Sequence, residues 1–239
     1  SGSSKISILN NYLKLNFIIT NDQAEIVKAN LRNKDLSISF DSLIKLNPFF
    51  EINSDIQINT IDKKLINNFS LKNILENKEI LKKFNSNNKV SYNKKRSRSS
   101  LIKSHSSEFN LAHGRLVFLS KIFISEGTIT CKGDSLLTEE YPRLNFDCFF
   151  NIKKKKKILK NFSISKKLDK DPVNLNVIGS INLFNNKINF EKINIGEDYI
   201  TKEEDINFFK ETFERVLFDE GFFNIFKINK IKEFLLEVI

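Results

Sequence analysis

Residues 50–59 read Phe50-Glu-Ile-Asn-Ser-Asp-Ile-Gln-Ile-Asn59, and apolar side chains recur at every second position except Ser54. Successive side chains of a β-strand point to opposite faces, so this stretch predicts a strand with one apolar and one polar face. The same alternation returns in Leu144-Asn-Phe-Asp-Cys-Phe-Phe-Asn-Ile152 and in Val173-Asn-Leu-Asn-Val-Ile-Gly-Ser-Ile-Asn-Leu183. We therefore expect a mainly β protein whose apolar sheet face is either covered or used.

The composition is that of a globular protein. The chain has 239 residues, 40% of them hydrophobic and 28% charged, which is enough to bury a core and too apolar for a disordered chain. The longest apolar run, residues 116–119, falls far short of the roughly 20 residues that a membrane-spanning helix needs. Because the sequence contains no methionine, we expect it to be a piece of a longer protein.

The chain is expected to have three parts. Residues 1–4 read as a tag or linker, residues 5–200 as the sheet domain, and residues 201–239 as a helical cap. Within the sheet domain, residues 62–84 predict a short helix and residues 85–107 a flexible basic loop, in which Val90 and Tyr92 are the only candidate strand residues. The expected strands cover residues 5–9, 12–19, 23–31, 36–40, 50–58, 108–112, 115–119, 121–125, 127–133, 144–152, 158–164, 173–183, 187–190 and 192–196.

Two helices are expected at the C-terminus. Thr201 and Glu204 form a capping box, and Ile206, Phe209 and Phe213 follow at helical spacing. A glycine at position 221 is expected to end the first helix, and a second helix follows residue 229. The predicted fold is thus a curved, open antiparallel sheet of many short strands, with one short internal helix and two C-terminal helices that pack on or cap the sheet.

No cluster of residues suggests catalysis, a metal or a cofactor. His105 and His113 lack acidic or thiol partners at the spacing of metal ligands, and Asp134, Glu139, Glu140 and Asp147 read as solvated turn residues; no glycine-rich nucleotide loop is present. We expect a non-enzymatic protein without a cofactor.

The two cysteines, Cys131 and Cys148, both fall on the apolar phase of their strands. Two interpretations stay open: two small buried side chains, or a disulfide between neighbouring strands.

Two basic runs, residues 94–98 and 153–157, contribute to the net charge of +10. Lysines between two alternating strands are typical of a solvated hairpin tip, and contact with an anionic membrane surface or with nucleic acid are the alternatives. An RNA-binding sheet would show aromatic side chains beside arginines on its open face, whereas the phenylalanines here are interleaved with Ile, Leu and Val. Nucleic acid is therefore not the expected partner.

The alternation itself allows three interpretations. The sheet and helices close an ordinary core, the strands belong to an outer-membrane barrel, or the sheet forms an open trough whose apolar inside holds acyl chains. The absence of tryptophan and the presence of only four tyrosines argue against the barrel, because such barrels carry aromatic girdles.

Four segments resemble a known family: residues 36–40, residues 114–118, residues 127–133 and residues 179–195. Their short-strand style, a glycine followed by alternating apolar residues and a turn, is similar to the C-terminal part of AsmA-like proteins, the group that includes TamB and YhdP. The resemblance covers about residues 5–200.

This resemblance implies a periplasmic module of an inner-membrane-anchored parent protein in a Gram-negative bacterium. Such a module would carry phospholipid between membranes along an apolar groove, support outer-membrane biogenesis, and meet the membrane through an upstream anchor or envelope partner proteins. The alternative is a structural or protein-binding β-domain whose C-terminal helices cover the same face. The expected lipid-facing residues are Phe50, Ile52, Ile56, Ile58, Leu144, Phe146, Phe150, Ile152, Val173, Leu175, Val177, Ile181 and Leu183.

Overall fold

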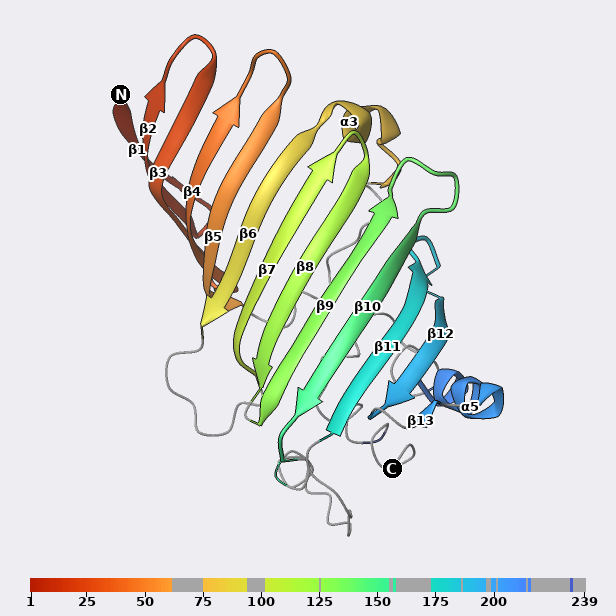
Figure 1. Ribbon diagram of the computed structural model, residues 1–239. Helices are drawn as coiled ribbons and strands as arrows, with labels where there is room; N and C mark the ends of the chain where they lie inside the picture. The colour runs from red at the N-terminus through yellow and green to blue at the C-terminus, as the bar shows by residue number, and fades with distance from the viewer. Residues whose placement is uncertain are drawn as a thin grey trace. The chain divides into compact units, whose positions relative to one another are not determined.

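The structure is a computed structural model that describes residues 1–61, 75–93, 102–124, 126–154, 157, 173–185, 187–196, 199–200, 202–213, 215 and 233. For residues 93, 102, 173, 195, 199 and 200 it describes the backbone alone. The described part is mainly β, as the alternation predicts, and its strands follow one another in space in the order of the chain (Figure 1).

The described strands form one mixed sheet in the order β1 to β13, which does not return to its first strand. Their bounds are β1 Gly2–Ile8, β2 Asn11–Ile19, β3 Gln23–Arg32, β4 Leu36–Lys45, β5 Glu51–Ile61, β6 Asn85–Asn93, β7 Ile102–Ala112, β8 Arg115–Ile124, β9 Gly127–Leu136, β10 Arg143–Ile152, β11 Val173–Asn182, β12 Ile188–Ile195 and β13 Tyr199–Ile200. The helices in the described part are α3 Lys78–Lys83 and α5 Glu203–Phe213.

The prediction of an antiparallel sheet is wrong at one pair of strands. β5 and β6 run parallel, in a register that places Glu51 beside Asn85 and Ile58 beside Tyr92. Parallel neighbours need a long crossover instead of a tight turn, and the 23 residues between Ile61 and Asn85, which include α3, supply its length.

The chain divides into two compact units, each described by itself below. The N-terminal unit comprises Ser1–Lys95, Ser104–Ser120 and Leu136–Glu139. The C-terminal unit comprises Arg96–Lys103, Lys121–Ser135 and Glu140–Ile239.

The prediction of a flexible loop over residues 85–107 is wrong, because β6 and the start of β7 lie there. The Ser- and Asn-rich composition of β6 disfavours a strand locally, but pairing with β5 and β7 satisfies its backbone. Its polar side chains also bond across the sheet: Ser91 Oγ lies 2.9 Å from Gln57 Oε1, and the Asn110 amide donates to the Asn87 side chain.

Other boundaries differ in detail. Residues 115–124 form one strand, β8, instead of two, and β1 starts at Gly2, so residues set aside as a tag or linker pair with β2. The two strands expected over residues 187–190 and 192–196 are one strand, β12, with a bulge between them: Ile178 pairs with Lys192, but Gly179 pairs with Phe190. The strand expected at 158–164 lies outside the described residues.

The helix predictions are tested only in part. The internal helix is α3, near the end of the range 62–84, and its first predicted residues lie outside the described part. α5 agrees with the first C-terminal helix, although Thr201 is not described and the carboxylate of Asp205 accepts the hydrogen bond from the Lys202 amide. Glycine 221 and the second helix lie outside the described residues, except Glu233.

Candidate functional site: the apolar faces of the sheet

In the N-terminal unit, the predicted residues of β5 share one face with the apolar residues of β4. Phe40 lies opposite Ile56, and Ile44 lies opposite Ile52. The paired registers extend this face to β2, β3, β6 and β7. We call it the N-terminal apolar face; it comprises Leu13, Phe17, Ile26, Leu31, Ile38, Phe40, Ile44, Ile52, Ile56, Ile58, Val90, Phe109 and Leu111.

Every side chain of the N-terminal apolar face is half-buried. By contrast, the positions between them carry polar residues, as at Glu51, Asn53, Asp55 and Gln57 of β5. The face therefore keeps accessible apolar surface along several neighbouring strands, interrupted by the polar side chains of Ser42, Ser54, Ser86 and Asn88, which share its phase. Accessible apolar surface of this kind is expected of an interaction surface.

Phe50 stands at the margin of this face. It precedes β5, is 41% exposed, and its ring centroid lies 5.8 Å from that of Phe84. The two rings line a shallow hollow of about 360 Å³ together with Glu79, Ile80 and Lys83 of α3. Ile80 itself is 63% exposed, so apolar surface continues onto α3.

In the C-terminal unit, the predicted residues of β10 and β11 also share one face. Leu144 lies opposite Ile181, and Phe150 lies opposite Leu175. The C-terminal apolar face comprises Leu144, Phe146, Cys148, Phe150, Ile152, Leu175, Val177, Ile181, Ile188, Phe190 and Ile193. Of the remaining predicted residues, Val173 has its backbone in register on this face, and Leu183 follows β11 in the turn, half-buried.

Part of the C-terminal apolar face is a buried core. Val177, Ile188, Phe190 and Ile193 are each at most 7% exposed. Two aromatic rings of α5 meet Phe190 edge to face, Phe209 at 5.1 Å and Phe213 at 5.2 Å between ring centroids. Edge-to-face ring pairs at this separation are favourable beyond the area they bury. α5 therefore packs against the buried core of the C-terminal apolar face.

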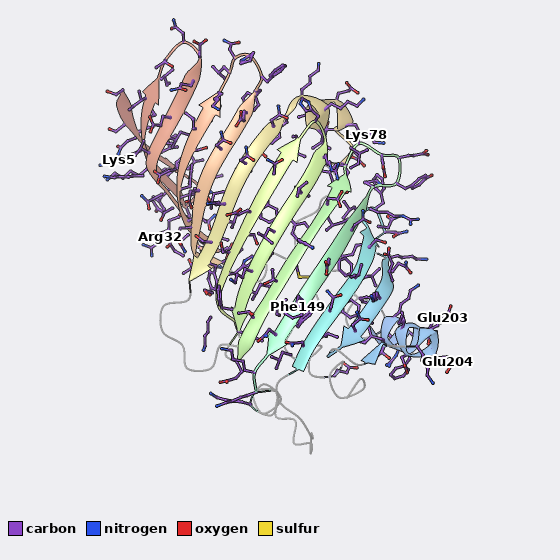
Figure 2. All side chains as sticks on the ribbon, in the orientation of Figure 1. Lys5, Arg32, Lys78, Phe149, Glu203 and Glu204 are labelled. Atoms are coloured by element: carbon purple, nitrogen blue, oxygen red, sulfur yellow. A yellow bond between two sulfur atoms is a disulfide. The ribbon has the colours of Figure 1, made fainter. Side chains whose placement is uncertain are left out.

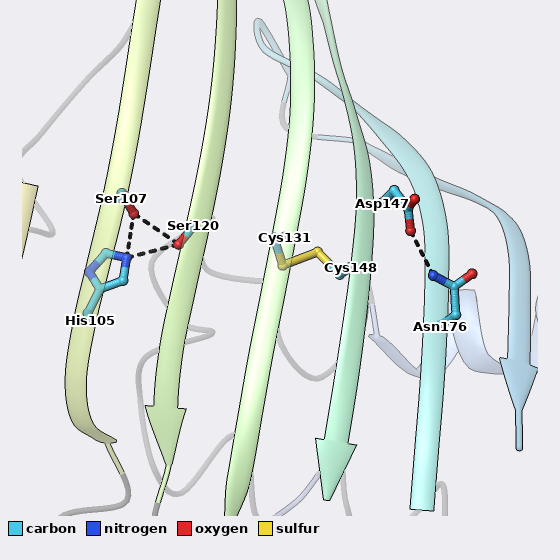
Figure 3. Close-up of a disulfide and its surroundings, with 7 residues drawn as sticks. All are labelled: His105, Ser107, Ser120, Cys131, Asp147, Cys148 and Asn176. Carbon is cyan, nitrogen blue, oxygen red and sulfur yellow. Dashed lines mark hydrogen bonds between the residues drawn. A yellow bond between two sulfur atoms is a disulfide. The ribbon is translucent and has the colours of Figure 1, made fainter. Parts of the chain in front are cut away.

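The two cysteines are bonded to each other. Cys131 of β9 and Cys148 of β10 are directly opposite in register and form a disulfide on the C-terminal apolar face (Figure 3). The sequence left two interpretations open, and the structure confirms the second, a disulfide between neighbouring strands. On the opposite face of β10, Asp147 accepts a hydrogen bond from Asn176 and pairs with Lys132, and Phe149 is 43% exposed (Figure 2).

A polar cluster interrupts the N-terminal apolar face at β7 and β8. His105 Nε2 lies 2.6 Å from Ser107 Oγ and 2.9 Å from Ser120 Oγ, and the two hydroxyl oxygens lie 2.9 Å apart (Figure 3). Ser107 is 1% exposed, whereas His105 and Ser120 are half-buried. Burial lowers the pKa of His105 below its ordinary value, because desolvation disfavours the charged ring.

The sequence-based prediction missed this cluster, because it placed His105 and Ser107 in a flexible loop over residues 85–107 and considered His105 only as a candidate metal ligand. The signal was present in the alternation: residues 105 and 107 share the phase of Phe109 and Leu111, and Ser120 shares the phase of Phe118. Polar residues in the apolar phase of two neighbouring strands therefore predict a polar cluster on the apolar face.

The basic runs are only partly described. Residues 94–98 all lie outside the described part, and so do residues 155 and 156 of the second run. Lys157 forms an ion pair with Glu126 and holds the pKa of that carboxyl below its ordinary value through a hydrogen bond. At least one lysine of the second run is therefore engaged within the protein.

The described residues hold neither a metal-binding cluster nor a membrane-spanning helix. No group of three or more His, Cys, Asp or Glu side chains in this part of the chain is arranged to hold a metal ion. No helix in it is long and apolar enough to cross a membrane.

The comparisons with known proteins add no relative: no protein-family model, no curated protein and no solved structure matches the chain. Similarity to AsmA-like proteins therefore stays a prediction from the short-strand style of the sequence.

Proposed function

We propose that the chain is a non-enzymatic module that binds the acyl chains of phospholipids along its N-terminal apolar face. One observation carries the proposal: apolar side chains from β2 to β7 share one face and are half-buried, so they remain accessible. In this reading the chain is an AsmA-like piece that serves phospholipid transport and outer-membrane biogenesis.

The energy available to such a surface is sufficient without a polar anchor. Full burial of one Val, Leu, Ile or Phe side chain contributes about 1.5–3 kcal/mol, and a half-buried side chain still has part of this to gain. A row of Phe40, Ile56 and Val90, which register places side by side on β4, β5 and β6, would cover several methylene groups of an acyl chain.

The disulfide supports the proposed compartment. Disulfides persist in oxidising environments such as the bacterial periplasm and are rare in the cytosol. A bonded pair at Cys131 and Cys148 is what a periplasmic module would carry. Attachment to the inner membrane through an upstream segment of the parent protein, or through envelope partners, belongs to the same proposal.

A second function is favoured by a different observation. α5 covers part of the C-terminal apolar face, with Phe209 and Phe213 on Phe190. If the rest of the C-terminal cap extends this cover, the protein is a structural or protein-binding β-domain that holds no lipid. The two functions differ in whether lipid reaches the N-terminal apolar face.

Site-specific photo-crosslinking separates the two functions. A benzophenone amino acid replaces Ile56 on the apolar face or, as the matched control, Gln57 on the opposite face of the same strand; both side chains are half-buried. The purified chain is mixed with vesicles of phosphatidylethanolamine and phosphatidylglycerol, irradiated and analysed by mass spectrometry. We expect phospholipid adducts at position 56 and few at position 57.

Adducts at neither position, or equal yields at both, would overturn lipid binding by this face. A benzophenone at position 146 tests the second function in the same experiment, because Phe146 packs against the cluster that α5 contacts. Crosslinks from position 146 to α5 alone, combined with lipid at position 56, would assign core packing to one face and lipid to the other.

A further inference from the structure

The cluster of His105, Ser107 and Ser120 leaves one hydrogen-bond donor without a partner. The three contacting atoms, Nε2 and two Oγ, belong to groups that carry three hydrogens when the ring is neutral: two hydroxyl hydrogens and one ring N–H. The contacts of Nε2 with Ser107 and Ser120 are the only side-chain hydrogen bonds of His105 within the described part of the chain.

Either tautomer of the ring gives the same count. If Nδ1 carries the hydrogen, Nε2 accepts from a serine hydroxyl and the Nδ1–H group points out of the cluster. If Nε2 carries it, Nε2–H donates to one serine, that serine donates to the other, and the last hydroxyl hydrogen is left over. In both cases two hydrogens satisfy the cluster and one remains available to a ligand.

The surroundings decide which ligand suits this donor. Tyr92 lies directly opposite His105 in register and Val90 directly opposite Ser107, and Phe109 and Phe118 occupy the next positions of the same phase on β7 and β8. A neutral donor among mostly apolar and aromatic side chains favours a neutral acceptor that is attached to an apolar chain, because burial of an uncompensated anion is costly. The lowered pKa of His105 agrees with this, since it keeps the ring uncharged at neutral pH.

We infer that the His105 cluster is a hydrogen-bond anchor for the ester carbonyl of an acylglycerol lipid. The carbonyl oxygen accepts the spare hydrogen of the cluster, and the attached acyl chain lies on the apolar side chains beside it. This inference rests on the proposed function. It adds the class of ligand and the position of the ester group on the N-terminal apolar face, beside His105 on β7.

A catalytic reading of the same residues fits less well. A hydrogen-bonded serine and histidine form the core of many hydrolase sites. Here Ser107, which is closest to Nε2, is 1% exposed and cannot reach a substrate, and no carboxylate within the described residues bonds His105 to orient it.

An ester and its ether analogue test the anchor, because they differ only in the carbonyl group. Monoolein and its 1-O-oleyl ether compete with phospholipid for crosslinking at position 56 in the full-length chain. A single neutral hydrogen bond predicts that the ester competes about fivefold better. His105→Phe is expected to abolish this preference and to leave competition by the ether unchanged.

Ser120→Ala locates the spare hydrogen. If Nδ1 carries the ring hydrogen, the ester preference should remain, because Ser107 still bonds Nε2. If Nε2 carries it, the spare hydrogen is that of the Ser120 hydroxyl, and the ester preference should be lost with it. Circular dichroism verifies that both variants fold. An equal effect of ester and ether on the unsubstituted chain would overturn the anchor while lipid binding stands, whereas the absence of any lipid crosslink would overturn the proposed function itself. An ester preference that survives His105→Phe would also overturn the anchor.

Discussion

Two strands with the same sequence pattern, β5 and β10, carry apolar faces that differ in what covers them. Phe146 and Phe150 of β10 pack against a core that α5 contacts, and the central side chain of that core, Phe190, is 7% exposed. Ile52, Ile56 and the other side chains of the N-terminal apolar face are half-buried, as Phe146 and Phe150 are, so the difference lies in the buried cluster around Phe190. The alternation alone predicted the same role for both.

The difference separates stability from binding. Apolar surface that is already removed from water stabilises the fold and has little left to offer a ligand. Accessible apolar surface contributes less to stability and retains a driving force for association. We therefore assign the part of the C-terminal apolar face around Phe190 to the core and the N-terminal apolar face mainly to recognition.

Phe190→Ala should have the largest effect, because Phe190 joins Phe146 of the sheet to Phe209 and Phe213 of α5. Truncation of a buried phenylalanine lowers the free energy of unfolding by about 3–5 kcal/mol. Urea unfolding followed by circular dichroism measures the loss, and hydrogen exchange locates it in the C-terminal unit.

The matched control is Phe118→Ala in β8. Phe118 is half-buried in the N-terminal unit, so its truncation should cost clearly less. Equal losses for the two variants would contradict the contrast between the faces.

The disulfide should have the second largest effect. Cys131 and Cys148 are 17 residues apart in sequence, and closing a loop of about that length stabilises a protein by about 3 kcal/mol in the chain-entropy view. The double substitution Cys131→Ala and Cys148→Ala is expected to lower the free energy of unfolding by about 2–3 kcal/mol, chiefly in the C-terminal unit.

Reducing agent provides the control for this variant. It should lower the stability of the unsubstituted chain by a similar amount and leave the double variant unaffected. Stability that is insensitive to reduction would show that the bond does not contribute.

A smaller effect is expected at the bulge between β11 and β12. A Cβ atom on Gly179 would lie 2.3 Å from the backbone oxygen of Asn189, so Gly179→Ala forces the two strands apart. We expect a loss of about 1–3 kcal/mol in the free energy of unfolding. Gly196→Ala is the comparison, because its Cβ would meet nothing within 4 Å and only its φ of +72° disfavours alanine. A milder effect at position 179 than at position 196 would contradict close strand packing at the bulge.

The sequence correctly predicted which side chains of a strand share one face of the sheet, because side-chain alternation is a property of the strand itself. Phe146 and Phe150 fall on one face, and Ile52 and Ile56 fall on one face, since a paired register cannot mix the two phases. The bulge near residue 191 follows the same rule, because an extra residue there shifts the phase within β12, at the position where the sequence predicted a break between two strands.

The partners of each strand, both the neighbouring strands and the helix that covers it, were less predictable from the sequence. β6 is rich in serine and asparagine, and its identity as a strand depends on pairing with β5, which a local pattern does not encode. The cover of Phe190 by α5 likewise depends on a contact between distant segments. The His105 cluster was hidden because each of its residues is ordinary alone and acquires meaning only when β7 and β8 bring the three together.

The smallest expected effect is a dependence of stability on pH that originates from His105. Its pKa is lowered in the folded protein by burial, so the unfolded chain binds a proton at higher pH than the folded chain does. The free energy of unfolding should therefore fall as pH is lowered from 7.5 through the ordinary histidine pKa of about 6.5. The slope should be modest, because the ring is half-buried and partly solvated.

The slope is measured as the difference between the unsubstituted chain and His105→Phe in urea unfolding at several pH values, which cancels the contribution of other groups. His113→Asn is the matched control: it substitutes the other histidine, which stands in the β7–β8 turn at a φ of +50° that asparagine tolerates. This control should keep the slope and His105→Phe should lose it. If the stability of His105→Phe depended on pH as strongly as that of the unsubstituted chain, the pKa of His105 would be the same in the folded and unfolded states. The ring would then be in contact with water in the folded protein, and the N-terminal apolar face would be open to water at the position where an ester is expected to bind.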